Sequence, residues 1–273
     1  MKAIMFQGTA SSVGKSTIAA GVCRILYQDG KRVAPFKSQN MSTHSYRLSN
    51  GRELSIAQWI QAKACGLSPD WRMNPILLKP VAEAGSEVIL AGESLGKMSA
   101  RDYYRQKPAF LDIIRQSLAE LSRRADLIVI EGAGSAAEIN FRPGDFVNMG
   151  LAQLVQAPVI LIGDIDRGGV FASLYGTIQL LDEADRSLIK GFIINKFRGD
   201  VSLLKETVDQ FSDKLGLPCL GIVPFFPHNL PEEDSLIEAK TDTGHSVDQS
   251  LDQLARHLRE HLDIAQLKRI AGL

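Results

Sequence analysis

The sequence predicts an α/β protein with a doubly wound, mostly parallel sheet and helices on both of its faces. Short apolar runs alternate with amphipathic stretches along all 273 residues. The runs DLIVIEGAG (126–134), PVILIGDID (158–166) and IKGFIINKF (189–197) are almost continuously apolar, which is typical of parallel strands covered on both faces. Since no Pro/Ser-rich linker separates two halves, we expect a single domain over residues 1–273.

The chain begins with a strand, a helix and a second strand. AIMF (3–6) is short and apolar, and STIAAGVCRILYQDG (16–30) has apolar residues at helical spacing before a closing glycine. RVAPFK (32–37) is the next candidate strand. Polar stretches at 38–52 and 67–108 are longer than ordinary connections, and we interpret them as irregular loops around an active site.

Helices and strands alternate through the rest of the chain, as in proteins whose parallel strands are joined by crossover helices. LGIVPF (220–225) is the last candidate strand, and 227–248 is interpreted as a surface excursion. Apolar residues at helical spacing predict helices over 53–66, 109–125, 171–186, 201–216 and about 248–271.

Composition excludes several classes of protein. Lys plus Arg and Asp plus Glu number 31 each, so bulk charge favours neither a nucleic acid nor a membrane surface as partner. Cys23, Cys65 and Cys219 are odd in number and far apart, which predicts neither a zinc site nor a disulfide framework. No stretch resembles a signal peptide or a membrane span, and we expect a cytoplasmic protein.

The stretch FQGTASSVGKST (6–17) predicts a phosphate-binding loop. Five residues separate its first glycine from Gly-Lys, where the common pattern has four, so the evidence is the context: the loop follows a strand and opens a helix. Backbone N–H groups there face an anion, a lysine adds a charge at the terminal phosphates, and a serine hydroxyl can bind Mg²⁺. The residues predicted to hold the nucleotide are Gly8, Thr9, Ser12, Val13, Gly14, Lys15, Ser16 and Thr17.

Charged residues at strand ends are candidates for the metal site and for catalysis. Glu131 ends the LIVI strand, at the edge where open α/β sheets place ligands. Glu53 opens a predicted helix and is a second metal candidate, although Glu is also common there because it complements the helix dipole. Lys37 ends the second strand near the predicted position of Lys15, where it could neutralise a transferring phosphoryl group.

Two further polar stretches suggest ligand contacts. Asn195 ends the FIIN strand with an amide that matches an adenine edge, although a simple turn residue explains an isolated Asn as well. Asp164, Asp166 and Arg167 could bind substrate amides and carboxylates or lie at a subunit interface, and the spacing leaves both open. Asn140 belongs to a similarly polar stretch, 137–150.

Several of these stretches together resemble the synthetase domain of the cobyric acid synthase family. The resemblance runs from residue 6 to about residue 235, and its most specific motifs are KSQNM, DIDRGGVFA and INKFRGD. A wider kinship to dethiobiotin synthetases is visible in the five-residue phosphate loop, the EGAG turn and the strand-end Asn. The resemblance implies the same doubly wound fold.

This resemblance implies an activity and a distribution of roles. Members phosphorylate substrate carboxylates with Mg-ATP, and ammonia then attacks the acyl phosphate to give an amide, here on a corrinoid. Lys15 and Ser16 would bind the phosphates and the metal, Glu131 and Glu53 would complete the metal site, and Lys37 would act at the transferring phosphoryl. The remaining assignments are adenine for Asn195, and substrate for Gln39, Asn40, Asn140, Asp164, Asp166 and Arg167.

One departure from the family concerns the source of ammonia. Cobyric acid synthases continue into a glutaminase domain with a nucleophilic Cys, whereas no Gly-x-Cys-x-Gly stretch occurs in these 273 residues. We therefore expect a stand-alone synthetase that uses free ammonia or a separate glutaminase subunit, or whose chemistry serves another carboxylate. The alternatives are a dethiobiotin-synthetase-like carboxylation with CO₂ and a non-catalytic nucleotide-switch ATPase. Relatives suggest a homodimer.

Overall fold

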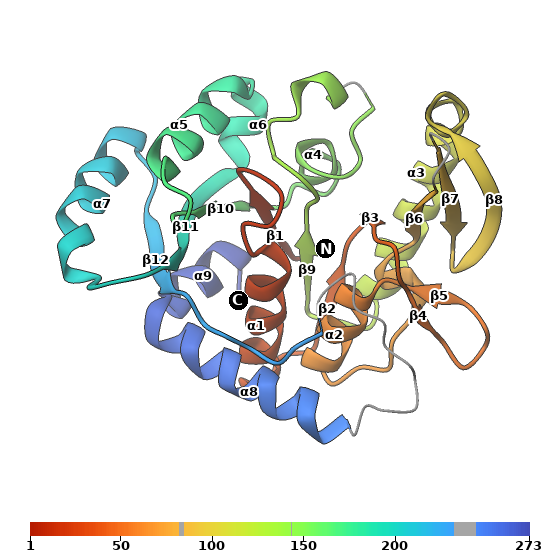
Figure 1. Cartoon of the computed structure of the whole chain (residues 1–273), viewed down its shortest axis with the longest axis horizontal. Helices are drawn as coiled ribbons and strands as arrows, with labels where there is room; N and C mark the ends of the chain where they lie inside the picture. Colours follow the sequence, from red (N-terminus) through yellow and green to blue (C-terminus); the bar gives the residue numbers. More distant parts are fainter. Residues whose placement is uncertain (82–84, 143, 232–243) are drawn as a thin grey trace.

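The centre of the computed structural model, which describes residues 1–81, 85–142, 144–231 and 244–273, is a six-stranded parallel sheet (Figure 1). Its strand order is β12-β11-β10-β1-β9-β2. The predicted fold class is confirmed. The strands are β1 (Ala3–Gly8), β2 (Val33–Phe36), β9 (Leu127–Glu131), β10 (Val159–Asp164), β11 (Ile189–Phe197) and β12 (Cys219–Pro224).

Burial explains why the central strands are apolar on both faces. All residues of β1 and β9 are buried, because helices cover both sides of the sheet. In the register of the sheet, Met5 of β1 lies beside Ile130 of β9 and Val159 of β10. The carboxyl ends of these parallel strands therefore meet at one edge, which gathers the residues that follow them.

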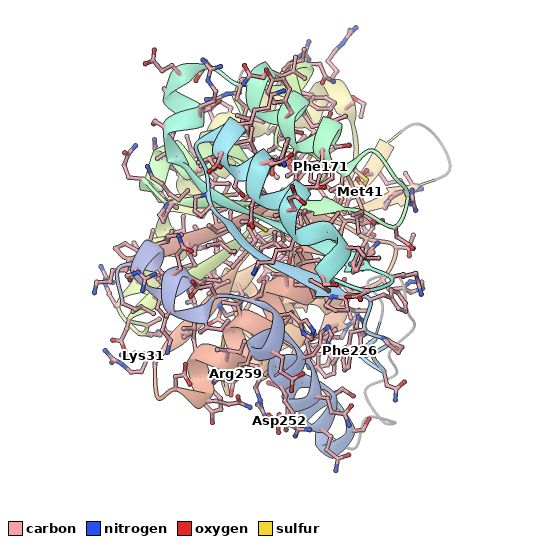
Figure 2. The ribbon with its side chains drawn as sticks, turned by 90° about the vertical axis from the view of Figure 1, so that its left-hand side faces the viewer. Lys31, Met41, Phe171, Phe226, Asp252 and Arg259 are labelled. Atoms are coloured by element: carbon pink, nitrogen blue, oxygen red, sulfur yellow. The ribbon has the colours of Figure 1, made fainter. Side chains whose placement is uncertain are left out.

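Helices α1 (Lys15–Gln28), α2 (Ile56–Ala64) and α8 (Gly244–His261) pack against one another on one face of the sheet. Ion pairs fasten α8 to α1: Arg24 meets Asp252 at 2.7 Å, and Arg259 meets Asp29 at 2.6 Å (Figure 2). The helices of the other crossovers are α3 (Ala100–Ser122), α4 (Met149–Val155), α5 (Val170–Leu180), α6 (Glu183–Leu188) and α7 (Ser202–Leu215).

A second sheet replaces the irregular loops expected at 38–52 and 67–108, so that prediction is wrong. Its strand order is β3-β6-β7-β8, and β4 pairs with β5 in a separate antiparallel ribbon. Ala91 (φ +52°) and Gly92 (φ +82°) form a tight turn between β7 and β8, as two-residue hairpins require. The strands are β3 (Gln39–Met41), β4 (Tyr46–Arg47), β5 (Glu53–Leu54), β6 (Ile76–Val81), β7 (Gly85–Leu90) and β8 (Glu93–Ser99).

Three predicted helices have wrong boundaries, and capping residues give the reason. The predicted helix 53–66 begins only at Ile56, because Ser55 is the N-cap and accepts from the N–H of Gln58. The helix predicted over 171–186 is divided into α5 and α6, and Asp182 caps the second one. The predicted helix 109–125 starts earlier, at Ala100, where Ser99 provides the cap.

The predicted C-terminal helix 248–271 is also divided. Leu262 forms a β-bridge with Gly221, and Asp263 then caps α9 (Ile264–Ala271). Two short helices and α4 were not predicted: η1 (Trp71–Met73) lies in a stretch taken as irregular, and η2 (Ile139–Phe141) lies in the polar stretch 137–150. Part of the surface excursion predicted over 227–248 lies outside the described residues.

One hydrophobic cluster runs from Ala3 to Ala271 and joins the sheet to the helices on both faces. The extent of the domain, 1–273, stays a prediction. None of the helices in the described part of the chain combines the length and the apolar character that crossing a bilayer requires.

Candidate active site

The predicted phosphate loop connects β1 to α1, and its backbone requires glycine at two positions. Gly14 has φ +97° and is the N-cap of α1. A Cβ atom on Gly14 would lie 2.2 Å from Asn195 Nδ2, and one on Gly8 would lie 2.6 Å from Val13 Cγ2. The loop therefore folds back tightly on itself, with the N-terminus of α1 open toward the sheet edge.

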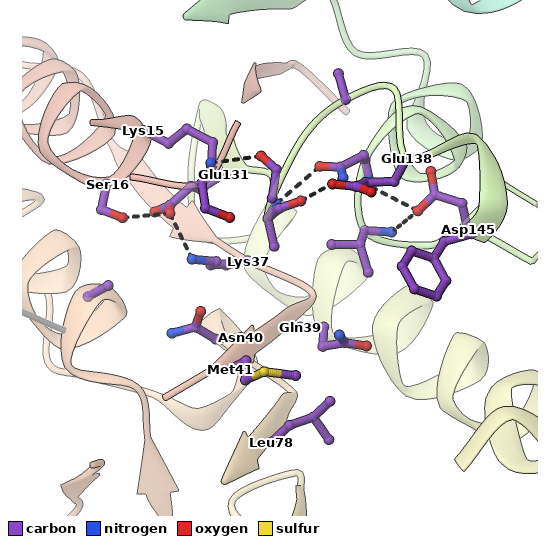
Figure 3. A pocket seen from close by; sticks show the side chains of 18 of the residues that line it. Lys15, Ser16, Lys37, Gln39, Asn40, Met41, Leu78, Glu131, Glu138 and Asp145 are labelled. Atoms are coloured by element: carbon purple, nitrogen blue, oxygen red, sulfur yellow. Dashed lines mark hydrogen bonds and ion pairs between the residues drawn. The ribbon is translucent and has the colours of Figure 1, made fainter. Parts of the chain in front are cut away.

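Lys15 lies at the first turn of α1 and reaches across the loop. Its ammonium donates hydrogen bonds to the carbonyl oxygens of Ala10 and Gly134, each at 2.9 Å. The side chain is only 7% exposed. These contacts tie the phosphate loop to the turn after β9, so the charge of Lys15 faces the same edge as Glu131 (Figure 3).

Glu131 is the centre of the site and is completely buried. Its Oε1 accepts hydrogen bonds from Ser16 Oγ at 2.7 Å and from Lys37 Nζ at 2.8 Å (Figure 3). Its Oε2 accepts from Gln61 Nε2 at 2.6 Å, and Gln58 Nε2 lies 3.4 Å away. The sequence predicted that Ser16, Lys37 and Glu131 share this edge of the sheet; the structure brings these side chains into contact.

The carboxyl group of Glu131 is held in its charged form. Burial acts to raise its pKa, but the charge and hydrogen bond of Lys37, with the hydrogen bonds from Ser16 and Gln61, outweigh it and hold the pKa below its ordinary value. A buried anion next to a serine hydroxyl offers two hard oxygen ligands. These residues therefore fit a Mg²⁺ ion, which typically binds one or two carboxylates together with substrate phosphates.

The turn after β9 is shaped by one side chain. The Asn148 amide donates to the carbonyl oxygens of Ala133 and Ser135 at 2.7 and 2.9 Å, and its oxygen accepts from the N–H of Ala133 at 3.0 Å. A Cβ atom on Gly132 would lie 2.3 Å from Asn148 Oδ1. This close approach explains the glycine and fixes the backbone that follows Glu131.

Glu53 differs most from its predicted position. It lies in β5 instead of opening a helix, which corrects the expectation. Its carboxylate contacts Lys79 and Ser45, and Arg47 Nη2 is 3.7 Å away. None of these contacts involves the Glu131 cluster, and Glu53 does not line the cavity described below. Its predicted role as a metal ligand has no support from these contacts and remains only a prediction.

Five of the residues expected to bind adenine or substrate do not face the cavity over this cluster. Asn195 donates to the carbonyl oxygen of Val13 at 2.8 Å, so its amide supports the phosphate loop. Asp164 pairs with Lys196 at 2.8 Å, and Asp166 pairs with Arg198 at 2.8 Å. None of Asn140, Asp164, Asp166, Arg167 and Asn195 lines the cavity described below.

A cavity of about 1240 Å³ opens over the cluster. Gln39 and Asn40 line it, and Gln39 accepts a hydrogen bond from Tyr103, so two of the predicted substrate residues face the cavity. The phosphate end of the cavity is lined by Ser11, Ser12, Gly14, Lys15, Ser16, Thr17, Lys37, Glu131, Lys196 and His228. The far end combines two kinds of side chain. Its apolar and aromatic members are Met41, Leu78, Val88, Met98, Tyr103, Tyr104, Ile139, Phe141 and Val147, and its charged members are Lys107, Glu138, Arg142, Asp145, Asp182 and Asp185.

Aromatic rings from two elements meet at the far end. The rings of Tyr104 on α3 and Phe141 on η2 stack at 6.4 Å and 19°. Lys107 Nζ lies 4.4 Å from the centre of the Tyr104 ring, and burial lowers the pKa of Lys107, opposed by the charge of Asp145. Arg142 also lines the cavity and pairs with Asp185 at 2.7 Å.

Sequence reasoning missed the residues that arrive from other elements. Gln58 and Gln61 stand three apart on α2, which places both amides on one helix face. Two amides at that spacing in a mostly apolar helix were the available signal. Tyr104, Phe141 and His228 carried no local signal, because only the chain fold brings them to the cavity.

Comparison with known proteins identifies the family of this chain. The profile of the family described as "CobQ/CobB/MinD/ParA nucleotide binding domain" matches residues 4–237. A cobyric acid synthase of Ruminiclostridium cellulolyticum is 50% identical over 99% of this chain, and one of Clostridium acetobutylicum is 50% identical over 98%. Each match covers 54% of the relative, so the chain spans about half the length of the curated relatives it matches.

Solved structures show more distant likenesses. The signal recognition particle receptor FtsY of Elizabethkingia anophelis is 15% identical, with a TM-score of 0.48, over 91% of this chain and 64% of FtsY. The cell division protein MinD of Aquifex aeolicus is 16% identical, with a TM-score of 0.45, over 95% of this chain and 98% of MinD. Likenesses this distant say nothing about function.

Proposed function

We propose that this chain, which belongs to the CobQ/CobB/MinD/ParA nucleotide binding domain family, uses ATP to activate a carboxylate of a corrinoid for amidation by ammonia. The observation that carries the proposal is the contact of Ser16 and Lys37 with the buried Glu131 beneath a large cavity. The relatives that share half of its residues are named cobyric acid synthases, which supports a corrinoid as the substrate.

The phosphate end of the cavity binds and orients the nucleotide. Backbone N–H groups at the N-terminus of α1 and the ammonium of Lys15 attract the phosphates. Ser16 and Glu131 would hold Mg²⁺, which when bound neutralises phosphate charge. In the described residues, no three His, Cys, Asp or Glu side chains form a metal cluster, so oxygen atoms of the nucleotide would complete the coordination.

Lys37 acts where the phosphoryl group moves. A carboxylate oxygen of the substrate forms a bond to the γ-phosphorus, the bond from phosphorus to the bridging oxygen breaks, and ADP leaves. Phosphoryl transfer of this kind depends on positioning and on charge neutralisation. The ion pair with Glu131 keeps the Lys37 ammonium at the cavity wall, next to the phosphates that Lys15 binds.

The second step forms the amide. Ammonia attacks the carbonyl carbon of the acyl phosphate, phosphate leaves, and the nitrogen loses a proton. Water competes for the same carbon, so a substrate that fills the cavity and excludes water from it favours the amide. None of the three cysteines, all of which lie in the described part of the chain, lines the cavity. The ammonia is therefore either free or delivered by a glutaminase that acts elsewhere.

The size and lining of the cavity support a large carboxylic acid as the substrate. Its volume, about 1240 Å³, exceeds the roughly 300–1,000 Å³ of ordinary small-molecule sites. Tyr104 and Phe141 offer an apolar surface to a macrocycle, while Lys107 places a cationic group near it for a peripheral carboxylate. Arg142 lines the same cavity but is already paired with Asp185. Asn40 and Gln39 add hydrogen-bonding groups between the two ends.

Incubation of the purified chain with Mg-ATP, ammonium chloride and a corrinoid diamide tests the proposal. ADP release and the mass of the corrinoid are measured together, and we expect each amidation to replace one hydroxyl group by an amino group. Parallel reactions replace ammonium by glutamine, or the corrinoid by diaminopelargonic acid with bicarbonate. Lys15→Met serves as the inactive control.

The outcomes separate the candidate functions. Amidation with ammonium but not with glutamine points to an external ammonia supplier. ADP release only with diaminopelargonic acid and bicarbonate overturns the corrinoid proposal in favour of carboxylation. ATP hydrolysis that none of the acids stimulates favours a nucleotide switch. The predicted homodimer is tested in the same preparation by sedimentation.

A further inference from the structure

His228 lines the cavity at its phosphate end, and the mechanism proposed above does not use it. Its Nε2 lies 3.4 Å from the hydroxyl oxygen of Thr17 in the first turn of α1. Lys15 and Ser16 precede Thr17 directly and line the same cavity. An imidazole therefore stands beside the groups that bind phosphate.

The segment that carries His228 is held on both sides of it. We call residues 225–231, which follow β12, the strap. The ring of Phe226 stacks on His257 of α8 at 4.6 Å and 18°, and a ring nitrogen of His257 lies 3.1 Å from the carbonyl oxygen of Pro224 (Figure 2). Leu230 at the other end is buried in the core, with 7% of its surface exposed.

Anchors on both sides of His228 mean that its position is determined by the fold. Figure 1 shows the chain after β12 crossing in front of α1 on its way toward α2. Because the strap is already ordered, a ligand that contacts His228 does not have to order this segment first. The strap thus resembles a preformed wall of the nucleotide site.

The contact between Thr17 and His228 is too long to be a strong hydrogen bond. Its 3.4 Å exceeds the 2.7–3.2 Å that is typical of N–H···O bonds. A hydroxyl and an imidazole nitrogen at this separation can instead both donate to one acceptor placed between them. At the N-terminus of a helix, next to the phosphate-loop lysine, that acceptor is a phosphate oxygen.

We propose that His228 binds the nucleotide, donating a hydrogen bond to the phosphate chain of ATP together with Thr17. The strap then contributes a side chain to the phosphate site from a segment more than two hundred residues after the phosphate loop. This inference rests on the proposed function only in that the nucleotide is ATP; it does not depend on which carboxylate is activated.

Titration calorimetry with Mg-ATP on the purified chain and its His228→Ala variant tests the inference. A hydrogen bond to a charged group predicts an affinity about 10-fold weaker in the variant. His228→Gln retains an N–H donor and should recover part of the affinity. His44→Ala is the matched control, because His44 does not line the cavity, and it should bind Mg-ATP like the unchanged chain.

Displacement of a fluorescent ATP analogue by inorganic tripolyphosphate identifies the part of the nucleotide that is contacted. We expect His228→Ala to weaken the binding of tripolyphosphate and the binding of ATP by the same factor. An unchanged affinity of His228→Ala for ATP overturns the inference. A weaker affinity for ATP with an unchanged affinity for tripolyphosphate overturns it too, since His228 would then contact the base or the ribose.

A purely structural role for His228 also has a distinct signature. It would lower the melting temperature of His228→Ala, leave the affinity for tripolyphosphate intact, and thereby overturn the inference. Failure of the proposed function is a separate result: the chain would then bind no Mg-ATP, or would bind it and form no amide. In the second case the affinity measurements still decide about His228.

Discussion

Lys37 and Glu131 form a fully enclosed ion pair, with 2.8 Å between Nζ and Oε1 and side chains that are 4% and 0% exposed. Removing one partner leaves the other charge buried and uncompensated. We expect Lys37→Met to lower the free energy of unfolding by about 3–5 kcal/mol, as measured by urea unfolding. The double variant Lys37→Met/Glu131→Gln should lose less, because no isolated charge remains.

A surface pair provides the control for this prediction. Arg32 and Asp126 are 71% and 40% exposed, so solvent screens their attraction and Arg32→Ala should change the free energy of unfolding far less than Lys37→Met does. If Lys37→Met destabilises the protein no more than Arg32→Ala does, the buried pair does not stabilise the site. ADP formation should disappear in Lys37→Met and persist in Arg32→Ala.

Gln61 positions Glu131 for a metal ion through the 2.6 Å hydrogen bond to Oε2. Groups that orient metal ligands typically contribute about 10-fold or more to metal affinity. Gln61→Leu should therefore need about 10-fold more Mg²⁺ for half-maximal ADP formation. Gln58→Leu, whose amide lies 3.4 Å from the same oxygen, should show a smaller shift. Equal Mg²⁺ dependence in all three proteins would contradict this role.

Gly14 and Gly30 allow a matched comparison of two glycines with positive φ. Alanine at either position strains the backbone. Gly14→Ala also places a Cβ 2.2 Å from Asn195 Nδ2, whereas a Cβ on Gly30 meets nothing within 4 Å. Gly14→Ala should abolish Mg-ATP binding. Gly30→Ala should cost about 1–2 kcal/mol of stability from backbone strain and leave binding unchanged. Calorimetry and urea unfolding measure the two effects; loss of binding in both variants would refute the steric explanation.

The attachment of the two C-terminal helices should weaken in acid. Burial acts to raise the pKa of Asp29, but hydrogen bonds from Arg259 and Lys268 outweigh it and hold the pKa below its ordinary value. A carboxyl group whose pKa is depressed by folding stabilises the folded protein at pH values above its pKa in the unfolded chain. This stabilisation is lost as the pH falls through its pKa in the folded protein. The stability difference between the unchanged chain and Asp29→Asn should be constant at neutral pH and shrink below about pH 4.

Urea unfolding as a function of pH measures that difference. The control is Asp112→Asn, since Asp112 is 79% exposed and lies 3.5 Å from Arg115. This variant should differ little from the unchanged chain at every pH. A difference for Asp29→Asn that grows toward low pH would show that the sign of the argument is wrong.

The thiols should be unreactive in the folded protein. Burial raises the pKa of Cys219, a half-buried residue, to about 11. Cys65 is buried, its pKa is raised by burial and by Cys23, and Cys23 is buried too. Alkylation needs the thiolate. Iodoacetamide at pH 8 should leave all three cysteines unmodified by mass spectrometry, and modify all three after unfolding. Rapid labelling of any of them under native conditions would contradict the buried packing.

The second sheet shows where local patterns mislead. Residues 67–108 were interpreted as irregular because the stretch is polar and longer than an ordinary connection. Within it, the sequence of β8, ESLGKMS, has no apolar alternation, and the strand is almost entirely exposed. Its pairing with β7 depends on the turn at Ala91 and Gly92, where only the glycine is a recognised turn residue. An exposed edge hairpin is thus held by backbone pairing that composition does not reveal.

The sequence by itself determined the parallel sheet, the phosphate loop and the shared edge of Ser16, Lys37 and Glu131. Each of these follows from local rules: apolar runs become buried strands, glycines permit the tight loop, and parallel strands end at one edge. The tertiary structure alone decided that Gln61 and His228 reach this edge and that Glu53 and Asp166 pair elsewhere. The physical reason is that those contacts join segments far apart in the chain, and packing, not local pattern, selects them.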